Sequence, residues 1–372
     1  MKAPAVNIHR EKQPDWFRQS RLGIFIHWGV YSVPAYAPDK GEDIGTILSR
    51  CGSEYFYRRT PYAEWYQNSM ALEGSPTDIH HREHYGSKPY SAFAEEFRQS
   101  ARSADPEAWV RLFKDAGASY VVLVTKHHDG FTLFNSRVPH PRLGSYGLDF
   151  DFTGALAAAC RSAGLRFGIY YSSLLDWTFT SEPIHTVSDM FLRSNISSEY
   201  VDYCRDHWLE LIDRYSPDIL WSDIGYPPDE RLPELFRHYY ERVPEGLVND
   251  RWSALPDRLR KLNRRGLLRG DVAFNTAMNL CNARSPSYYD YRTQEYSSGK
   301  NPSGRCFELC RGIDLSFGYN KHSRAENFMS PEEVRALIER LAANNGRLLL
   351  NVGPDMHGNI PEPQARVLRG LA

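Results

Sequence analysis

The sequence lacks the features that would direct it to a membrane or a nucleic acid. No apolar run approaches the ~18 residues that a transmembrane helix needs, and the N-terminal stretch MKAPAVNIHREKQPDWF carries charges where a signal peptide is apolar. The formal net charge is −1, so no strong field attracts nucleic acid or anionic lipid. We therefore expect a cytoplasmic protein that binds neither.

Cysteine is also scarce, with six scattered among 372 residues. Without an export signal, these cysteines are expected to be free thiols. Cys306 and Cys310 are four residues apart, but only His322 lies near them, which is a poor zinc pattern. The sequence therefore predicts neither a disulfide framework nor a structural metal, and implies no cofactor.

What the chain does contain is a series of hydrophobic strand-like runs that end in polar or aromatic residues. Buried strands that end in His, Trp, Asp or Arg are typical of an α/β barrel, whose active site is assembled at the carboxyl ends of its strands. Five such runs are Gly23–Gly29, Tyr120–Gly130, Phe167–Ser172, Asp218–Gly225 and Leu247–Trp252.

Helical patterns separate these runs, and alternation of strands with helices predicts a parallel sheet. Three further strands are expected at Tyr291–Tyr296, Gly312–Gly318 and Arg347–Val352, which makes eight in total. The expected helices are Pro106–Ala116, Asp151–Ala163, Glu199–Tyr215, Asp229–Arg242, Ser330–Ala343 and Pro361–Leu371. We therefore predict a single (β/α)8-type, TIM-like barrel domain over residues 1–372.

Two segments interrupt this rhythm. Ala37–Tyr62 is predicted to be a long polar loop after the first strand. Ser253–Asp290 is a long insertion after the fifth strand and begins with the basic stretch Arg258–Arg269. The basic stretch fits a solvated helix face, an acceptor-side loop or a subunit contact.

Asp223 is the first candidate for chemistry. It ends a buried strand that turns at Gly225, and Trp221 should face the same side because alternate strand residues share a face. A carboxylate at this position could be a nucleophile, a metal ligand or simply a helix cap. If it is a nucleophile for retaining glycoside hydrolysis, a second carboxyl group must lie about 5–5.5 Å away. Spacing alone leaves Glu295, Asp290 and Glu308 open for this role.

His127 and His128 follow the strongest strand of the sequence. Adjacent histidines on a strand diverge, which argues against a shared metal ion. They fit as hydrogen-bond donors to sugar hydroxyls, and a structural role for one of the two is the alternative. A metal-dependent barrel hydrolase that uses both histidines with Asp223 is the alternative enzyme hypothesis. A sugar-binding protein without catalysis is the third hypothesis, and it requires that no second carboxylate reach the site.

Eight motifs in order resemble the α-L-fucosidases of glycoside hydrolase family 29, from about Trp16 to the C-terminus. They are GIFIHWGVYSVPAYAP, YAEWYQNSM, YVVLVTKHHDGFTLFNS, FGIYYSSLLDW, DILWSDIGYP, VNDRW, LSFGYN and LLLNVGPDMHGNIPE. The resemblance implies removal of terminal α-L-fucose from oligosaccharides or glycoconjugates with retention, through a fucosyl-enzyme intermediate, and allows transfer of fucose to other acceptors. It implies no metal and no organic cofactor.

The resemblance also implies roles for particular residues. Asp223 corresponds to the nucleophile, and Glu295, in the segment that resembles x-T-x-E-Y, corresponds to the acid/base. The fucose-binding residues that it implies are His27, Glu64, Trp65, His127, His128, Tyr170, Trp221, Arg251 and Phe317.

Three features depart from the family pattern. The insertion Ser253–Asp290 separates Arg251 from Glu295, so the acid/base is the role most open to revision. Phe307 stands where the family usually has Trp. The C-terminal β-sandwich common in the family is not expected here, and a barrel face left uncovered by it would favour a homo-oligomer.

Overall fold

Eight parallel strands form the centre of the protein in the computed structural model, which describes residues 13–39, 41–180, 182–268, 271–280, 288–297, 299–301 and 304–372. Every strand pairing is parallel, as the alternation of strands and helices predicts. The strands are β1 (Leu22–Ile26), β2 (Tyr120–Lys126), β3 (Arg166–Ser172), β4 (Ile219–Asp223), β5 (Leu247–Val248), β6 (Arg292–Glu295), β7 (Phe307–Gly312) and β8 (Gly346–Val352).

The sheet curls into a barrel whose strand order is β5-β4-β3-β2-β1-β8-β7-β6. The first strand therefore pairs with the last, and β5 and β6 are the two edges. The amide of Asp290 donates to the carbonyl of Val248 over 2.9 Å, and the amide of Thr293 donates to the Asp250 carboxylate over 2.9 Å. These bonds join the two edges, and the arrangement confirms the predicted (β/α)8-type fold.

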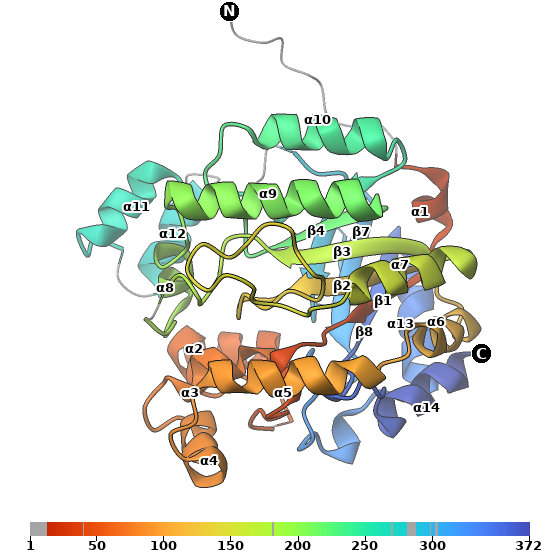
Figure 1. Cartoon of the computed structure of the whole chain (residues 1–372), viewed down its shortest axis with the longest axis horizontal. Coiled ribbons are helices and arrows are strands. Elements are labelled where there is room, and N and C mark those ends of the chain that lie inside the picture. The colour runs from red at the N-terminus through yellow and green to blue at the C-terminus, as the bar shows by residue number, and fades with distance from the viewer. Residues whose placement is uncertain are drawn as a thin grey trace, which may run out of the picture.

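Helices surround the strands (Figure 1). The six helices that the sequence predicts are present: α6 (Pro106–Asp115), α7 (Phe152–Ser162), α9 (Ser198–Tyr215), α10 (Leu232–Arg242), α13 (Pro331–Ala343) and α14 (Glu362–Leu371). Ser330 caps α13 through a reciprocal bond pair with Glu333, which fixes where this helix begins. The other helices are α1 (Asp15–Gln19), α2 (Ile44–Arg58), α3 (Tyr66–Met70), α4 (Pro76–Tyr85), α5 (Phe93–Ser100), α8 (Val187–Leu192), α11 (Asp257–Arg264) and α12 (Asp271–Leu280).

Strands β1, β2 and β4 are buried on both faces, which explains why their sequences are largely apolar rather than alternating. Ile24 and Ile26 belong to the core shared with the helices, whereas Phe25 points to the barrel interior with Tyr120 and Trp221. Gly23 is required on β1 because a Cβ there would lie 2.3 Å from the Tyr120 ring.

Two sequence predictions about elements are wrong. The seventh strand is Phe307–Gly312, and Gly312–Gly318 is an irregular loop that follows it. The true strand was hidden by Glu308, an inward-facing charge that breaks the apolar pattern but is satisfied by Tyr120 and Trp221. Ala37–Tyr62 is not simply a loop either, because it contains α2, which Asp43 caps at its N-terminus.

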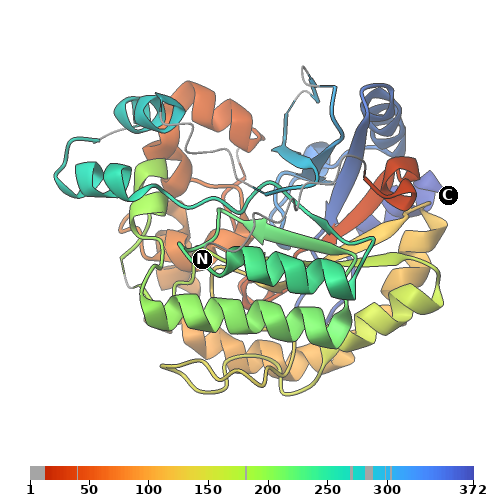
Figure 2. The same ribbon diagram turned by 90° about the horizontal axis from the view of Figure 1, so that it is seen from above.

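The insertion 253–290 contributes α11 and α12, which pack against α8 around a small apolar cluster. Figures 1 and 2 show α2, α8, α11 and α12 gathered beyond the carboxyl ends of the strands. Within the part of the chain that the structure describes, no helix is long and apolar enough to cross a bilayer.

Candidate active site

A cavity of about 200 Å³ opens at the carboxyl ends of the strands. All eleven site residues that the sequence analysis singled out line it: His27, Glu64, Trp65, His127, His128, Tyr170, Trp221, Asp223, Arg251, Glu295 and Phe317. They come from at least six strand ends and the loops that follow, so the fold assembles one site from segments as far apart as β1 and the loop after β7.

Asp223 ends β4 and is held by two donors. The Tyr170 hydroxyl donates to one carboxylate oxygen over 2.8 Å, and Arg251 Nη1 donates to the other over 2.7 Å. Burial by itself would raise the pKa of Asp223, but the charge of Arg251 and these hydrogen bonds hold the pKa below its usual value. Asp223 is therefore ionised near neutral pH, as a nucleophile must be.

Glu295 ends β6 and shares the same arginine. Arg251 Nη2 donates to Glu295 Oε2 over 3.2 Å, and the Tyr62 hydroxyl donates to Glu295 Oε1 over 2.7 Å. The Glu295 side chain is 25% exposed, against 11% for Asp223. One guanidinium thus joins the two carboxylates, and the more exposed of them is the better placed to exchange protons with solvent.

The two competing carboxylates are engaged away from the cavity. Asp290 Oδ2 accepts from the Tyr240 hydroxyl over 2.7 Å and from the Val248 amide over 2.8 Å, between β5 and β6. Glu308 lies in the barrel interior, where it accepts from Tyr120 and Trp221, and burial raises the pKa of its carboxyl to about 7. Neither side chain lines the cavity.

Two of the histidines have tautomers set by their neighbours. Asn351 donates its amide N–H to the Phe317 carbonyl, so its Oδ1 accepts from His27 Nδ1 over 2.6 Å. Ser172 donates to the Leu175 carbonyl, so its oxygen accepts from His128 Nδ1 over 2.6 Å. In both rings Nε2 is therefore the acceptor nitrogen.

Burial keeps these imidazoles neutral. It lowers the pKa of His27 to about 3 and that of His128 to about 4. His128 Nε2 lies 3.9 Å from an Asp223 oxygen. His127, also buried, has its ring centre 4.0 Å from that of His128 at an angle of 42°. Among the described residues, no group of three or more His, Cys, Asp or Glu side chains is placed to hold a metal ion.

Glu64, Trp65 and Phe317 lie beside the histidines in the cavity. Glu64 Oε2 accepts from the Gly318 amide over 2.7 Å, and burial raises the pKa of this carboxyl to about 8. The Trp65 ring meets the His128 ring edge-on with ring centres 5.1 Å apart, and the Phe317 ring lies against the His27 ring with centres 4.9 Å apart. Aromatic faces beside hydrogen-bonding groups are the combination that a sugar with both polar and apolar edges requires.

The sequence did not indicate two tyrosines of the cavity, Tyr57 and Tyr62, or most of its apolar residues. Tyr62 directly precedes the short 3-10 helix Ala63–Trp65, so its nearness in the sequence to Glu64 and Trp65 could have indicated it. The remaining lining residues, several of them from α2 and α8, were missed with those helices: Phe25, Ile44, Leu48, Phe56, Tyr57, Val187, Met190, Ile224 and Cys310.

Comparison with known proteins agrees with this geometry. The family model for Alpha-L-fucosidase matches residues 1–372. Tissue alpha-L-fucosidase of Rattus norvegicus is 29% identical over 368 residues, which are 95% of this chain and 66% of that protein. The chain thus spans about two thirds of the length of the curated relatives it matches, between 66% and 68% for the first three.

Solved structures agree as well. Thermotoga maritima alpha-fucosidase in complex with fucose has a TM-score of 0.79 and 37% identity, covering 97% of this chain and 73% of that one. A Thermotoga maritima alpha-L-fucosynthase has a TM-score of 0.81 and 38% identity with the same coverage. Matched over its whole length by the family model and over nearly all of it by these structures, the chain belongs to the alpha-L-fucosidase family.

Proposed function

We propose that this protein is a retaining α-L-fucosidase that removes terminal α-L-fucosyl residues from oligosaccharides or glycoconjugates. The observation that carries the proposal is the pair of carboxylates, Asp223 and Glu295, joined by Arg251 at the mouth of one cavity. Retention requires two carboxyl groups close enough for one to attack the sugar directly, whereas inversion needs room for a water between the base carboxylate and the sugar. Arg251 contacts both carboxylates at once, over 2.7 and 3.2 Å, which supports a pair that acts on one sugar.

In the first step, Asp223 attacks the anomeric carbon and the bond to the leaving oxygen breaks. Glu295, in its protonated form, gives its proton to that oxygen, so the leaving group departs neutral. In the second step, Glu295 takes a proton from water, the water oxygen bonds to the anomeric carbon, and Asp223 is released as a carboxylate. A sugar hydroxyl in place of water would give fucosyl transfer.

The remaining cavity residues bind the fucosyl ring. The neutral imidazoles of His27 and His128 each present an acceptor nitrogen, and Glu64 with its raised pKa can donate as a carboxylic acid at neutral pH. Trp65 and Phe317 offer apolar surface to the methyl group at C5. In this proposal the two carboxylates carry the covalent step and the proton transfers, and the surrounding side chains bind the fucosyl ring.

The decisive test is Asp223→Gly assayed on 4-nitrophenyl α-L-fucoside. Loss of the nucleophile should lower kcat by at least about a thousandfold, and azide should restore turnover with a β-fucosyl azide as product. Asp202→Asn on α9 is the matched control, because Asp202 is exposed and pairs with Arg231 at the surface, away from the cavity. Activity near that of the wild type in the Asp223 variant would contradict the assignment.

A further inference from the structure

The outer part of the cavity differs in chemistry from the fucose-binding part. Six of its lining side chains carry no charge, and the Met190 sulfur is their single, weak hydrogen-bond acceptor. These residues, the apolar wall, are Ile44, Leu48, Phe56, Val187, Met190 and Ile224. All but Phe56 are only partly buried: they pack against a buried apolar cluster on one side and line the open cavity on the other.

The apolar wall lies on the side of Glu295. A Cβ built on Gly45, in the first turn of α2, would lie 3.8 Å from the carbonyl oxygen of Tyr296, the residue after Glu295. Tyr62, which donates to Glu295, packs edge-on against Phe56 with ring centres 6.0 Å apart. Because the acid must reach the leaving oxygen, the leaving group occupies this side of the cavity.

The apolar wall is held in place by bonds between the three helices that carry and support it. The Ser53 amide and hydroxyl, on α2, both donate to the Asp271 carboxylate at the start of α12, over 3.0 and 2.6 Å. The Val187 amide of α8 donates to the Ser53 hydroxyl over 3.2 Å. Figures 1 and 2 both show α2, α8 and α12 adjacent beyond the strand ends.

Ile224 adds an independent observation. It follows Asp223 directly and has a φ angle of +63°, a left-handed conformation that costs a β-branched residue energy and that Gly or Asn adopts with less strain. The chain nevertheless places an isoleucine there, and its side chain lines the cavity. The strained backbone therefore presents one more apolar group to the cavity.

Tyr57 is the polar exception next to the apolar wall. Its hydroxyl contacts the Met190 sulfur at 3.5 Å, and burial raises the pKa of this phenol above its usual range, so it stays neutral. Asp189 and Asp271 lie near Tyr57 without lining the cavity. A polyhydroxylated leaving group would therefore find few partners here and would lose hydrogen bonds to water.

We propose that the apolar wall is a leaving-group subsite that selects fucosides whose leaving group presents an apolar surface: an aryl aglycone, or a sugar with an acetamido methyl group. This inference rests on the fucosidase function proposed above. Its expected consequence is a preference for these substrates over fucose linked to a sugar that has only hydroxyl substituents.

The test compares substrates that share fucose and differ in the leaving group. Leu48→Asn and Met190→Gln keep side-chain size while making the apolar wall polar. Each should lower kcat/KM for 4-nitrophenyl α-L-fucoside roughly tenfold, the scale of apolar discrimination in an enzyme pocket. The kcat/KM of both variants for α-L-fucosyl fluoride, whose leaving group is one atom, should fall much less. Ile79→Asn on α4, where Ile79 is 47% exposed, is the matched control and should affect neither.

The outcomes separate cleanly. A parallel loss on fluoride and nitrophenyl fucoside, or no loss on either, would overturn the subsite. Two disaccharides, fucosyl-N-acetylglucosamine and fucosyl-galactose, distinguish the two kinds of leaving group. A fall in kcat/KM on the first disaccharide but not on the second supports recognition of the acetamido methyl group. A fall confined to the nitrophenyl substrate supports recognition of an aryl aglycone. Failure of the wild type to hydrolyse fucosyl fluoride would instead contradict the proposed function.

Discussion

At the scale of single residues, Arg251 has the main influence on the charges of the site. Its guanidinium stays protonated at any relevant pH, so it favours the ionised form of Asp223 and occupies one oxygen of Glu295 at the same time. Tyr62 occupies the other Glu295 oxygen. A substrate must enter between these groups, so the hydrogen bonds to Glu295 are expected to rearrange when a leaving oxygen arrives.

Replacement of Glu295 tests the acid/base role. Glu295→Ala should lose about 10²- to 10⁴-fold in kcat/KM on a fucosyl disaccharide, which needs protonation, and much less on a substrate with a good leaving group. Azide should accelerate the variant because a small anion can take the place of the carboxylate. Absence of azide rescue here, with rescue in an Asp290 or Glu308 variant, would move the role to that residue.

Removal of the Tyr62 hydroxyl should affect Glu295 without disturbing packing. Tyr62→Phe keeps the ring contacts with Phe56 and Phe317 and removes one charge-assisted hydrogen bond. We expect kcat on a fucosyl disaccharide to fall roughly tenfold, the equivalent of about 1.4 kcal/mol. The kcat on fucosyl fluoride should change little. An equal loss on both substrates would show that Tyr62 supports the site as a whole rather than Glu295.

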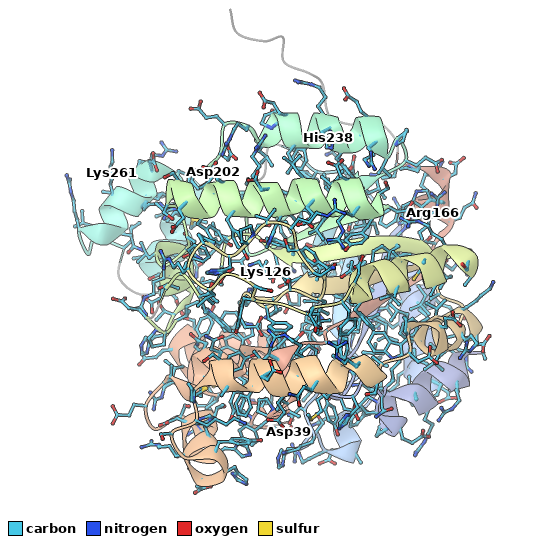
Figure 3. All side chains as sticks on the ribbon, viewed as in Figure 1. Asp39, Lys126, Arg166, Asp202, His238 and Lys261 are labelled. Atoms are coloured by element: carbon cyan, nitrogen blue, oxygen red, sulfur yellow. The ribbon has the colours of Figure 1, made fainter. Side chains whose placement is uncertain are left out.

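At the scale of elements, a buried ion pair joins the end of β2 to the loop after β3. Lys126 Nζ lies 2.8 Å from Asp176, and both side chains are fully buried. In Figure 3 Lys126 lies near the centre of the view, whereas Lys261 lies at the edge, on α11. Since the Trp177 amide donates to the His128 carbonyl over 2.7 Å, this pair positions the His127–His128 segment.

Breaking the pair should destabilise the protein strongly. Lys126→Met leaves the Asp176 carboxylate buried without its cation, and we expect the free energy of unfolding in urea to fall by about 3–5 kcal/mol. The double variant Lys126→Met/Asp176→Leu, which leaves no unpaired charge, should recover much of that loss. A single variant as stable as the wild type would contradict this account of the segment.

Element prediction succeeded where the pattern is local and failed where it depends on distant partners. The strands before Asp223 and after Ser119 are continuous apolar runs, so their ends could be read directly. Glu308 breaks the pattern of β7 because its partners, Tyr120 and Trp221, come from β2 and β4. The helix α2 was missed because Gly52, with φ of +78°, interrupts its periodicity.

At the scale of the whole molecule, buried ionisable groups couple stability to pH. His207 on α9 lies outside the cavity, where its ring contacts the Tyr171 hydroxyl and the Val138 carbonyl, and burial lowers its pKa from 6.5 to about 3. Between those values the unfolded chain binds more protons at this residue than the folded protein. The stabilising contribution of His207 is therefore complete above pH 6.5 and is lost as pH falls toward 3.

His207→Gln should remove this dependence. Between pH 6.5 and 5 the wild type should lose about 2 kcal/mol through His207 alone, so the stability difference between wild type and variant should shrink by that amount. Chemical denaturation of both proteins across this range measures it, and the comparison cancels the opposite effect of Glu64, whose pKa is raised. A difference that stays constant with pH would mean that His207 is not buried as a neutral base.

The sequence by itself determined the parallel barrel and eleven of the residues that line the cavity. Strand ends can be recognised from short apolar runs, and closure of a barrel brings those ends together whatever the loops do. Only the tertiary structure decided which carboxylate shares Arg251 with Asp223, since the paths of β6 and the insertion separate Glu295 from Asp290 and Glu308. It also brought α2 and α8 to the cavity as an apolar wall, because contacts between segments more than 130 residues apart leave no local pattern.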